Sequence, residues 1–286
     1  MNNVPNITLN NGVRMPILGL GVYQIDDLKV CERTVTDALQ LGYRLIDTAA
    51  VYENESAVGA AIRQSGLPRE EVFVTSKLWV QDFGYEKALR GFEQSLRNLG
   101  LDYLDLYLLH KPYGDYYGAW RALEKLYREG RIRAIGVTSF WNERLADLCH
   151  FNEVTPALNQ VETNVWWQQW PAQELMQRMG ICHQTWAPFA EGFNDVFHHP
   201  LLTQIALKHQ KTVAQVMLRF FIQRGIAVIP KTVHRERLAE NIDIFDFELD
   251  AEDMAQIRTL DHGHSLLSDD MDVNEALSMI EYEFHD

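Results

Sequence analysis

Short apolar runs alternate with longer amphipathic stretches along most of this chain. The short runs lack strict alternation of apolar and polar positions, which is typical of parallel strands buried on both faces. The longer stretches repeat apolar residues at helical spacing, which predicts helices that cover those strands. The strands are expected over residues 17–22, 43–47, 72–76, 104–109, 133–138, 157–161, 181–187 and 226–230. The helices are expected over about 54–64, 85–99, 115–129, 142–150, 171–179, 200–209, 212–224 and 234–242.

Eight strand–helix units without a break in composition predict a closed (β/α)8 TIM barrel, as a single domain over residues 1–286. A doubly wound open sheet is the alternative. Before the first unit, two short apolar stretches flank an Asn-Gly pair, which predicts a β-hairpin over 7–16 with a type I′ turn. After the last unit, a tail over about 261–286 matches no pattern that indicates a substrate site.

Composition and charge restrict the classes of partner and the cellular location that we expect. Of the 286 residues, 47% are hydrophobic, which is ordinary for a globular protein. The net charge of −14 disfavours nucleic acid and anionic membranes as partners. The start of the chain lacks the basic and apolar regions of a signal peptide, and no run approaches the roughly 18 apolar residues of a membrane span. The three cysteines, Cys31, Cys149 and Cys182, lie far apart, so we expect a cytoplasmic protein without disulfides or a metal site.

Three consecutive predicted strands end in the polar residues Asp47, Lys77 and His110, and Tyr52 follows the first of them. In such a barrel the catalytic groups lie at the C-terminal ends of the strands, so the four side chains are expected to face one pocket. The Lys77 ammonium is expected to lower the pKa of the Tyr52 phenol, while Asp47 holds Lys77 charged. His110, as a neutral donor, would hydrogen-bond a carbonyl oxygen. The set predicts protonation of an oxygen during carbonyl reduction.

A basic segment follows the eighth predicted strand of this acidic chain. Lys231, His234, Arg235 and Arg237 lie within seven residues, and Asn241 is expected to share a helix face with Arg237. Loops after the seventh and eighth strands of a barrel often bind phosphate, and the start of a helix favours anions. The segment therefore predicts a phosphorylated dinucleotide, NADPH rather than NADH. The dinucleotide is expected without a Rossmann fold, because the glycine fingerprint of that fold is incomplete.

Four specific motifs occur along the chain. They are Gly42-Tyr43-Arg44-Leu45-Ile46-Asp47-Thr48-Ala49 with Tyr52 and Asn54-Glu55, Ser76-Lys77-Leu78-Trp79, Leu108-Leu109-His110, and Ile229-Pro230-Lys231-Thr232 with Asn241. With these motifs the chain resembles the aldo-keto reductases, such as bacterial aldehyde reductases and 2,5-diketo-gluconate reductases, from the hairpin to about residue 260. The resemblance implies that Asp47, Tyr52, Lys77 and His110 form a catalytic tetrad in which Tyr52 is the general acid.

The same resemblance implies a set of cofactor contacts. Gln160 matches the residue that binds the nicotinamide carboxamide, and Trp186 takes the place of an aromatic residue, often Tyr, that stacks on the nicotinamide ring. Thr138 keeps a hydroxyl of the family's pattern, whereas Ser139 replaces the usual Asn and loses an amide. The other implied contacts are Gly21, Val22, Tyr23, Asp47, Pro188, Lys231, Thr232, Arg237, Glu240 and Asn241.

We therefore expect a monomeric, NADPH-dependent oxidoreductase that reduces aldehydes, ketones, dicarbonyls or keto sugar acids to alcohols. Two alternatives stay open: a barrel that binds NADPH as a non-catalytic sensor, and a Schiff-base aldolase that uses Lys77. By analogy with the family, the substrate pocket lies among Tyr23, Trp79, His110 and Tyr113.

Overall fold

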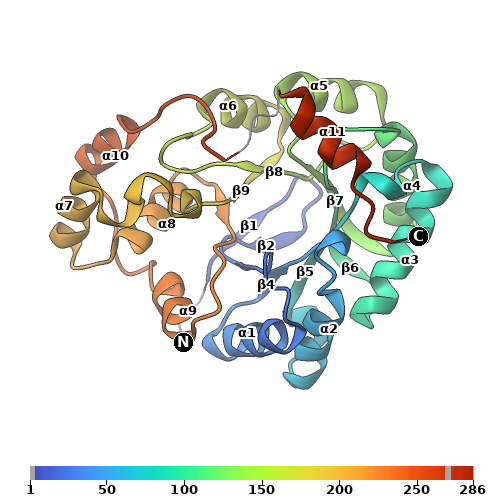
Figure 1. The fold of residues 1–286 in the computed structure, drawn as a ribbon, viewed down its shortest axis with the longest axis horizontal. Helices are drawn as coiled ribbons and strands as arrows, with labels where there is room; N and C mark the ends of the chain where they lie inside the picture. The colour runs from blue at the N-terminus through green and yellow to red at the C-terminus, as the bar shows by residue number, and fades with distance from the viewer. Residues whose placement is uncertain (1–3, 268–271, 286) are drawn as a thin grey trace.

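Eight parallel strands form a closed barrel in the computed structural model, which describes residues 4–267 and 272–285 (Figure 1). The first and last strands meet where the Gly19 amide donates to the Val228 carbonyl at 2.9 Å and the Val228 amide donates to the Ile17 carbonyl at 2.9 Å. This closure confirms the predicted (β/α)8 barrel, and the doubly wound alternative is wrong. In order around the barrel, the strands are β3 (Leu20–Gly21), β4 (Leu45–Asp47), β5 (Phe73–Leu78), β6 (Leu104–Leu109), β7 (Ile132–Thr138), β8 (Leu158–Glu162), β9 (Cys182–Trp186) and β10 (Ala227–Val228).

Helices surround the barrel, and every predicted helix is present within the described residues. Helix α1 (Leu28–Leu41) was not predicted; its start is fixed by Asp27, whose Oδ1 accepts from the amides of Lys29 at 2.8 Å and Val30 at 3.1 Å. Helices α10 (Ala251–Arg258) and α11 (Val273–Glu281) were not predicted either. The predicted helices are α2 (Glu55–Gln64), α3 (Tyr85–Leu99), α4 (Tyr116–Arg128), α5 (Asn142–Phe151), α6 (Trp170–Met179), α7 (Pro200–His209), α8 (Val213–Gln223) and α9 (Arg235–Ile242). Short 3-10 helices are η1 (Ala50–Tyr52), η2 (Arg69–Glu71), η3 (Val80–Asp82) and η4 (Ala190–His198).

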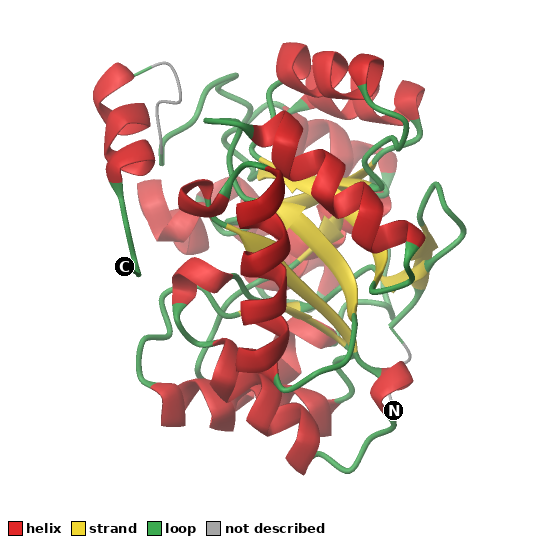
Figure 2. Cartoon of the chain, turned by 90° about the vertical axis from the view of Figure 1, so that its right-hand side faces the viewer, coloured by secondary structure: helices red, strands yellow, loops and turns green. Residues whose placement is uncertain are grey.

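Two apolar layers hold the barrel together. One lies between the strands and the surrounding helices. The other lies inside the N-terminal half of the barrel, where Leu45, Phe73 and Leu106 pack in one cluster with Met15 of the hairpin. The N-terminal end of the chain and helix α11 lie at opposite ends of the barrel (Figure 2). Since apolar side chains fill the N-terminal half, the buried polar side chains of the interior gather at the other end.

The hairpin of β1 (Asn6–Thr8) and β2 (Arg14–Pro16) is confirmed, but its turn differs from the predicted type I′. The Leu9 amide donates to the Val13 carbonyl and the Gly12 amide donates to the Leu9 carbonyl, both at 2.9 Å. A type I′ turn needs positive φ at two central residues, whereas within this loop only Gly12 has one, at 85°. The chain thus makes a type I turn followed by a left-handed glycine, and it avoids the strain of a left-handed Asn11.

The C-terminal segment folds back over the end of the barrel where the strands terminate. The indole nitrogen of Trp79 donates to the Tyr282 carbonyl at 3.0 Å, and the Gln81 amide donates to the His285 carbonyl at 2.6 Å. His285 Nε2 lies 2.9 Å from an Asp82 carboxylate oxygen. The segment that matched no sequence pattern therefore packs against η3. Within the described residues, no helix combines the length and the apolarity needed to cross a membrane.

Gly59 lets α2 lie directly against the end of α3. A Cβ at this position would collide with the backbone carbonyl of Leu99, so Gly59→Ala must push the two helices apart. We expect a loss of about 1–3 kcal/mol in the free energy of unfolding, measured by urea denaturation. Ser56→Ala, at an exposed position of the same helix, is the control and should change it by less than about 0.5 kcal/mol. Equal stability of the two variants would contradict this packing.

Candidate active site

The strand ends bring Asp47, Lys77 and His110 together, with Tyr52 beside them. Asp47 ends β4, Lys77 lies next to the end of β5, and His110 directly follows β6. The Lys77 ammonium donates to Asp47 Oδ1 at 2.5 Å, and its Nζ lies 3.4 Å from the Tyr52 hydroxyl oxygen. The Tyr52 and His110 ring centroids lie 5.6 Å apart. The structure thus brings together the four residues singled out from the sequence.

The loop that carries Tyr52 is tied to the neighbouring loop by Asn54. Tyr52 ends the 3-10 helix η1, just after β4. The buried Asn54 side chain accepts from the Thr48 hydroxyl at 2.7 Å and donates to the Val22 carbonyl at 3.0 Å. These bonds join the loops after β3 and β4, and they hold Tyr52 over the end of the barrel.

Lys77 and Asp47 form a buried ion pair whose remaining polar positions are filled. The Lys77 ammonium also donates to the Thr48 carbonyl at 2.9 Å, and Asp47 Oδ2 accepts from the Gln160 amide at 2.9 Å. Burial raises the pKa of the Asp47 carboxyl, and the charge and hydrogen bond of Lys77 oppose this shift. Burial lowers the pKa of Lys77, and Asp47 opposes that shift in turn. Each charge is therefore stabilised mainly by the other.

The predicted direction of the Tyr52 pKa shift is wrong. Burial raises the pKa of the Tyr52 phenol well above its usual range, and the charges of Asp47 and Tyr23 add to the shift. Lys77 does not reverse it, because its ammonium is held at 2.5 Å by the Asp47 carboxylate and lies farther from the phenol. The raised pKa keeps Tyr52 protonated at neutral pH, so the phenol retains a proton that it can donate.

His110 is a neutral imidazole. Burial lowers its pKa well below the usual range, and the neighbouring cations Lys77 and Lys111 add to the shift. Its Nδ1 is a buried atom without a hydrogen-bond partner among the described residues. Its Nε2 is not one of these atoms. The imidazole can therefore donate one N–H toward the pocket without carrying a charge, as the sequence predicted.

Aromatic side chains surround these polar groups. The Tyr23 ring lies 5.0 Å from the Tyr52 ring, and Trp79 meets His110 edge to face at 5.1 Å. Tyr282 packs against Trp79 at 6.2 Å between ring centroids, and it was missed because its segment matched no motif. Tyr113 lies partly exposed in the loop after β6. Aromatic rings therefore border the polar groups at this end of the barrel.

The residues expected at the nicotinamide occupy the same rim of the barrel. Thr138 pairs with Gln160 in parallel register, and the Ser139 amide donates to the Gln160 carbonyl at 2.8 Å. Ser139 has a φ of 58°, a left-handed conformation that is uncommon for Ser. Trp186 ends β9 with its indole partly exposed. Of the other expected contacts, Gly21 ends β3, Val22 and Tyr23 follow that strand, and Pro188 follows β9.

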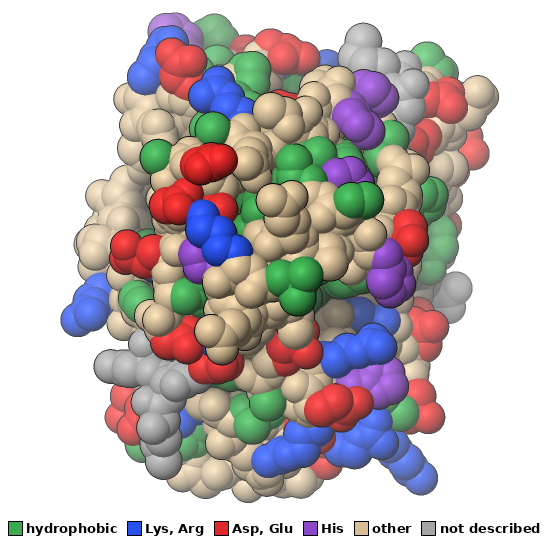
Figure 3. Space-filling model, turned by 90° about the vertical axis from the view of Figure 1, so that its left-hand side faces the viewer, with side chains coloured by type: hydrophobic (Ala, Val, Ile, Leu, Met, Phe, Trp, Pro, Cys, Tyr) green, Lys and Arg blue, Asp and Glu red, His purple; other side chains and the backbone are tan. Residues whose placement is uncertain are grey.

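The side chains of the basic segment differ in their exposure and in their partners. Arg235 forms an ion pair with Asp37 of α1, and Glu240 accepts from the Thr212 hydroxyl at 2.7 Å. Lys231 and Arg237 are exposed. Thr232 and Asn241 are buried. Arg237 and Asn241 lie four residues apart in α9, as expected, but only Arg237 is exposed. Figure 3 shows the side of the molecule over α7 to α10, where Lys and Arg side chains gather near the lower edge.

Comparison with known proteins agrees with this geometry. A sequence model described as "Aldo/keto reductase family" matches residues 18–262. Glyoxal reductase of Bacillus subtilis (strain 168) is 48% identical over 255 residues, which cover 89% of this chain and 92% of that protein. This chain belongs to the aldo/keto reductase family. It is therefore an oxidoreductase of the family that reduces carbonyl groups with NAD(P)H, as the motifs implied.

Other aldo/keto reductases share both sequence and fold with the chain. Morphine 6-dehydrogenase of Pseudomonas putida is 44% identical over 286 residues, covering 95% of this chain and 96% of that protein. MGS-M4, an aldo-keto reductase from a deep-sea metagenome library, superposes with a TM-score of 0.91 at 42% identity, covering 93% and 99% of the two chains. An aldo-keto reductase of Bombyx mori in complex with NADP superposes with a TM-score of 0.88 at 35% identity, covering 92% and 94%.

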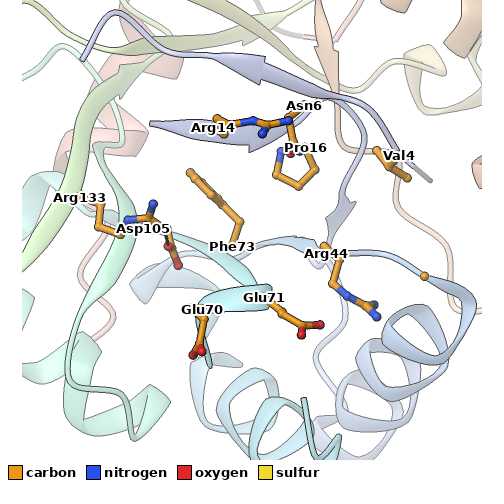
Figure 4. A pocket seen from close by; sticks show the side chains of 11 residues that line it. Val4, Asn6, Arg14, Pro16, Arg44, Glu70, Glu71, Phe73, Asp105 and Arg133 are labelled. Carbon is orange, nitrogen blue, oxygen red and sulfur yellow. Dashed lines mark hydrogen bonds and ion pairs between the residues drawn. The ribbon is translucent and has the colours of Figure 1, made fainter. Parts of the chain in front are cut away.

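A cavity of about 640 Å³ opens at the opposite end of this reductase barrel (Figure 4). Arg133 and Phe73 line it beside the hairpin, and no member of the tetrad does. The buried Asp105 carboxylate accepts there from Arg133 at 2.6 Å and forms an ion pair with Arg69 at 2.8 Å. These bonds tie neighbouring strand starts together, so the cavity is separate from the reacting groups. No cluster of three or more metal-binding side chains occurs within residues 4–267 and 272–285.

Gln184 is a site residue that the sequence analysis missed. It lies on β9, two residues before Trp186 and hence on the same face of the strand. Its Oε1 accepts from the Gln160 amide at 2.8 Å, so it extends the hydrogen bonds that begin at Asp47. Its polar side chain, at a position of a predicted strand that faces the barrel interior, was the feature of the sequence that could have identified it.

Removing the charge of Lys77 tests the buried ion pair. Lys77→Met would leave the Asp47 carboxylate buried without a counter-charge, which costs about 3–5 kcal/mol. The pKa of Asp47 is raised by burial, and the loss of Lys77 raises it further. A carboxyl whose folded-state pKa is raised destabilises the protein as pH rises above its unfolded pKa of roughly 3.9. We therefore expect the loss of unfolding free energy to grow from about pH 4 to 7, measured by urea denaturation.

The double variant Asp47→Asn, Lys77→Met is the control, because it removes both buried charges. Its stability should depend on pH less than that of Lys77→Met across the same range, because no buried carboxylate remains at position 47. A loss in Lys77→Met that is equal at both ends of the range would contradict a buried, uncompensated Asp47.

Proposed function

We propose that this protein is an NADPH-dependent reductase of aldehydes and ketones, with small dicarbonyls among its substrates. The proposal is carried by the Tyr52 hydroxyl, 3.4 Å from the Lys77 ammonium and beside the His110 ring at the end of the barrel. A protonated phenol and a neutral imidazole can both donate to one oxygen, as carbonyl reduction requires. The similarity to a glyoxal reductase supports the inclusion of dicarbonyls.

The residues of the tetrad would divide the reaction between them. His110 donates a hydrogen bond from Nε2 to the carbonyl oxygen and so positions it. Tyr52 transfers its phenol proton to the same oxygen as negative charge develops there. The Lys77 ammonium stabilises the resulting phenolate, and Asp47 keeps that ammonium in place. NADPH, when bound, supplies the hydride that reduces the carbonyl carbon.

The rim of the barrel suits a phosphorylated nicotinamide dinucleotide. Trp186 offers a partly exposed ring for stacking, and Thr138, Ser139 and Gln160 offer polar groups beside it. For the adenosine phosphate, the exposed Arg237 suits a bidentate contact, since no ion pair holds it among the described residues. The remaining contacts assigned by family resemblance, such as Lys231 and Thr232, belong to the same proposal. The complex of the Bombyx mori relative with NADP supports this choice of cofactor.

A Schiff-base aldolase is the second candidate, because burial lowers the pKa of Lys77 toward a reactive amine. The geometry disfavours it. Lys77 Nζ donates to Asp47, Thr48 and Tyr52, which uses the three N–H bonds of the ammonium. Trapping of a substrate on Lys77 by borohydride would favour the aldolase over the reductase.

Tyr52→Phe removes the proposed proton donor and keeps the ring. We expect kcat to fall about 10²–10⁴-fold with glyoxal and other small aldehydes, because general acid catalysis is lost. Turnover is followed by the absorbance of the reduced nicotinamide, and NADPH affinity by fluorescence titration should stay near that of wild type. Tyr85→Phe, a loss of hydroxyl at an exposed position on α3, is the control.

Two results would contradict the proposal. One is tight binding of NADPH by the wild type without oxidation by any carbonyl of the panel, which would indicate a sensor. The other is equal turnover in Tyr52→Phe and Tyr85→Phe, which would remove Tyr52 from the reaction.

Arg237→Ala tests the preference for NADPH. Loss of a hydrogen-bonded charge at the phosphate costs about 1.5–3 kcal/mol, so we expect KM for NADPH to rise roughly ten- to a hundredfold and KM for NADH to stay unchanged. Arg235→Ala is the control, because it removes an equal charge that is already paired with Asp37. It should leave the ratio of the KM values for NADPH and NADH unchanged. Similar effects of the two variants on the ratio would exclude a specific phosphate contact at Arg237.

A further inference from the structure

Gln184 is fully buried within the barrel and only partly hydrogen-bonded. Its Oε1 accepts from Gln160 Nε2 at 2.8 Å, whereas its own Nε2 has no partner among the described residues. An unpaired buried polar group costs about 1–3 kcal/mol, and the interior nearer the hairpin is built from apolar residues instead. Packing alone therefore does not explain an amide at this position.

The bond between the two glutamines has a fixed direction. The Asp47 carboxylate can only accept, and its Oδ2 lies 2.9 Å from Gln160 Nε2. Gln160 must therefore turn its NH₂ group to this side, and the second N–H of that group meets Gln184 Oε1. Reversing the Gln160 amide would place its oxygen against two acceptors, and reversing Gln184 would place donor against donor.

Because the NH₂ group of Gln160 meets Asp47 and Gln184, its Oε1 points away from both. The oxygen accepts no hydrogen bond from the described residues, and it is not among the buried atoms without a partner, so it is accessible to solvent. A carbonyl oxygen in this place suits an N–H donor. The nicotinamide carboxamide, assigned to Gln160 under the proposed function, is such a donor.

We propose that Gln184 is a positioning residue: it fixes the orientation of the Gln160 amide and so links the nicotinamide carboxamide to Asp47 and Lys77. The inference rests on the proposed function, because it requires a nicotinamide cofactor at Gln160. Without the acceptor on Gln184, the second N–H of the Gln160 amide loses its partner, and the amide is held by Asp47 alone and can pivot about that single hydrogen bond. Its oxygen then no longer faces the carboxamide in a single orientation.

Two cofactors distinguish this role from simple packing. NADP⁺ carries the carboxamide, whereas its 3-acetylpyridine analogue carries a methyl ketone there and has no N–H to donate. Affinities are measured by quenching of tryptophan fluorescence, to which Trp186 at the rim contributes. One hydrogen bond contributes about 1 kcal/mol, so we expect wild type to bind NADP⁺ roughly fivefold more tightly than the analogue. In Gln184→Met, which lacks a strong acceptor, the ratio should fall to about one.

Two further variants serve as controls. Gln184→Glu keeps an oxygen acceptor, since burial favours the protonated carboxyl, and it should retain the wild-type ratio. Gln168→Met alters another fully buried glutamine, whose amide donates to the Val165 carbonyl at 2.9 Å and the Ile257 carbonyl at 2.8 Å. It should lower stability and leave the ratio unchanged.

The outcomes separate the two proposals. A wild-type ratio in Gln184→Met overturns the positioning role and leaves the proposed function intact. If Gln184→Met does not fold, Gln184→Glu decides: retention of the ratio supports the role and its loss overturns it. A wild-type protein that does not bind NADP⁺, or binds the analogue equally well, instead contradicts the proposed cofactor contact at Gln160.

Discussion

The buried ion pair of Lys77 and Asp47 is the interaction on which the arrangement of the site depends. Neither charge contacts solvent, so the Thr48 carbonyl and the Gln160 amide must occupy the positions that water would fill. These partners come from different strands and loops. A one-residue slip of β5 against β4 would turn Lys77 out of the barrel and leave Asp47 without its counter-charge. The register of the sheet and the geometry of the site are therefore specified together.

Burial also sets the protonation of the two groups that face the pocket, with opposite effects on their pKa values. It raises the pKa of the Tyr52 phenol and lowers that of the His110 imidazole. Both groups are neutral at neutral pH as a result, and each carries a proton it can donate. A single low-dielectric environment thus provides two uncharged donors at one place. In the proposed reaction, Lys77 beside Tyr52 becomes important when the phenol releases its proton, because an ammonium favours the phenolate.

The barrel and the proximity of Asp47, Tyr52, Lys77 and His110 could be predicted because their signals are local. Apolar runs mark the strands, and a polar residue at the end of each run marks the rim. Tyr282 and Gln184 could not be assigned in this way, since the partner of Tyr282 lies 203 residues away and that of Gln184 on another strand. The shift of the Tyr52 pKa was predicted in the wrong direction because a sequence shows the neighbouring charges but not the burial that outweighs them. The type I′ turn was wrong because Asn-Gly also fits a three-residue loop with one left-handed glycine.

In the basic segment, too, the sequence does not show which side chains have partners in the fold. Arg235 and Arg237 carry the same charge and are both exposed, yet Arg235 forms an ion pair with Asp37 of α1 while Arg237 forms none with the described residues. The distinction matters in a protein with a net charge of −14, which repels an anionic cofactor at long range. Under the proposed function, attraction would come from basic side chains that no carboxylate neutralises, such as Arg237 near the start of α9. Partnering within the fold, rather than the number of basic residues, therefore decides where a phosphate can bind.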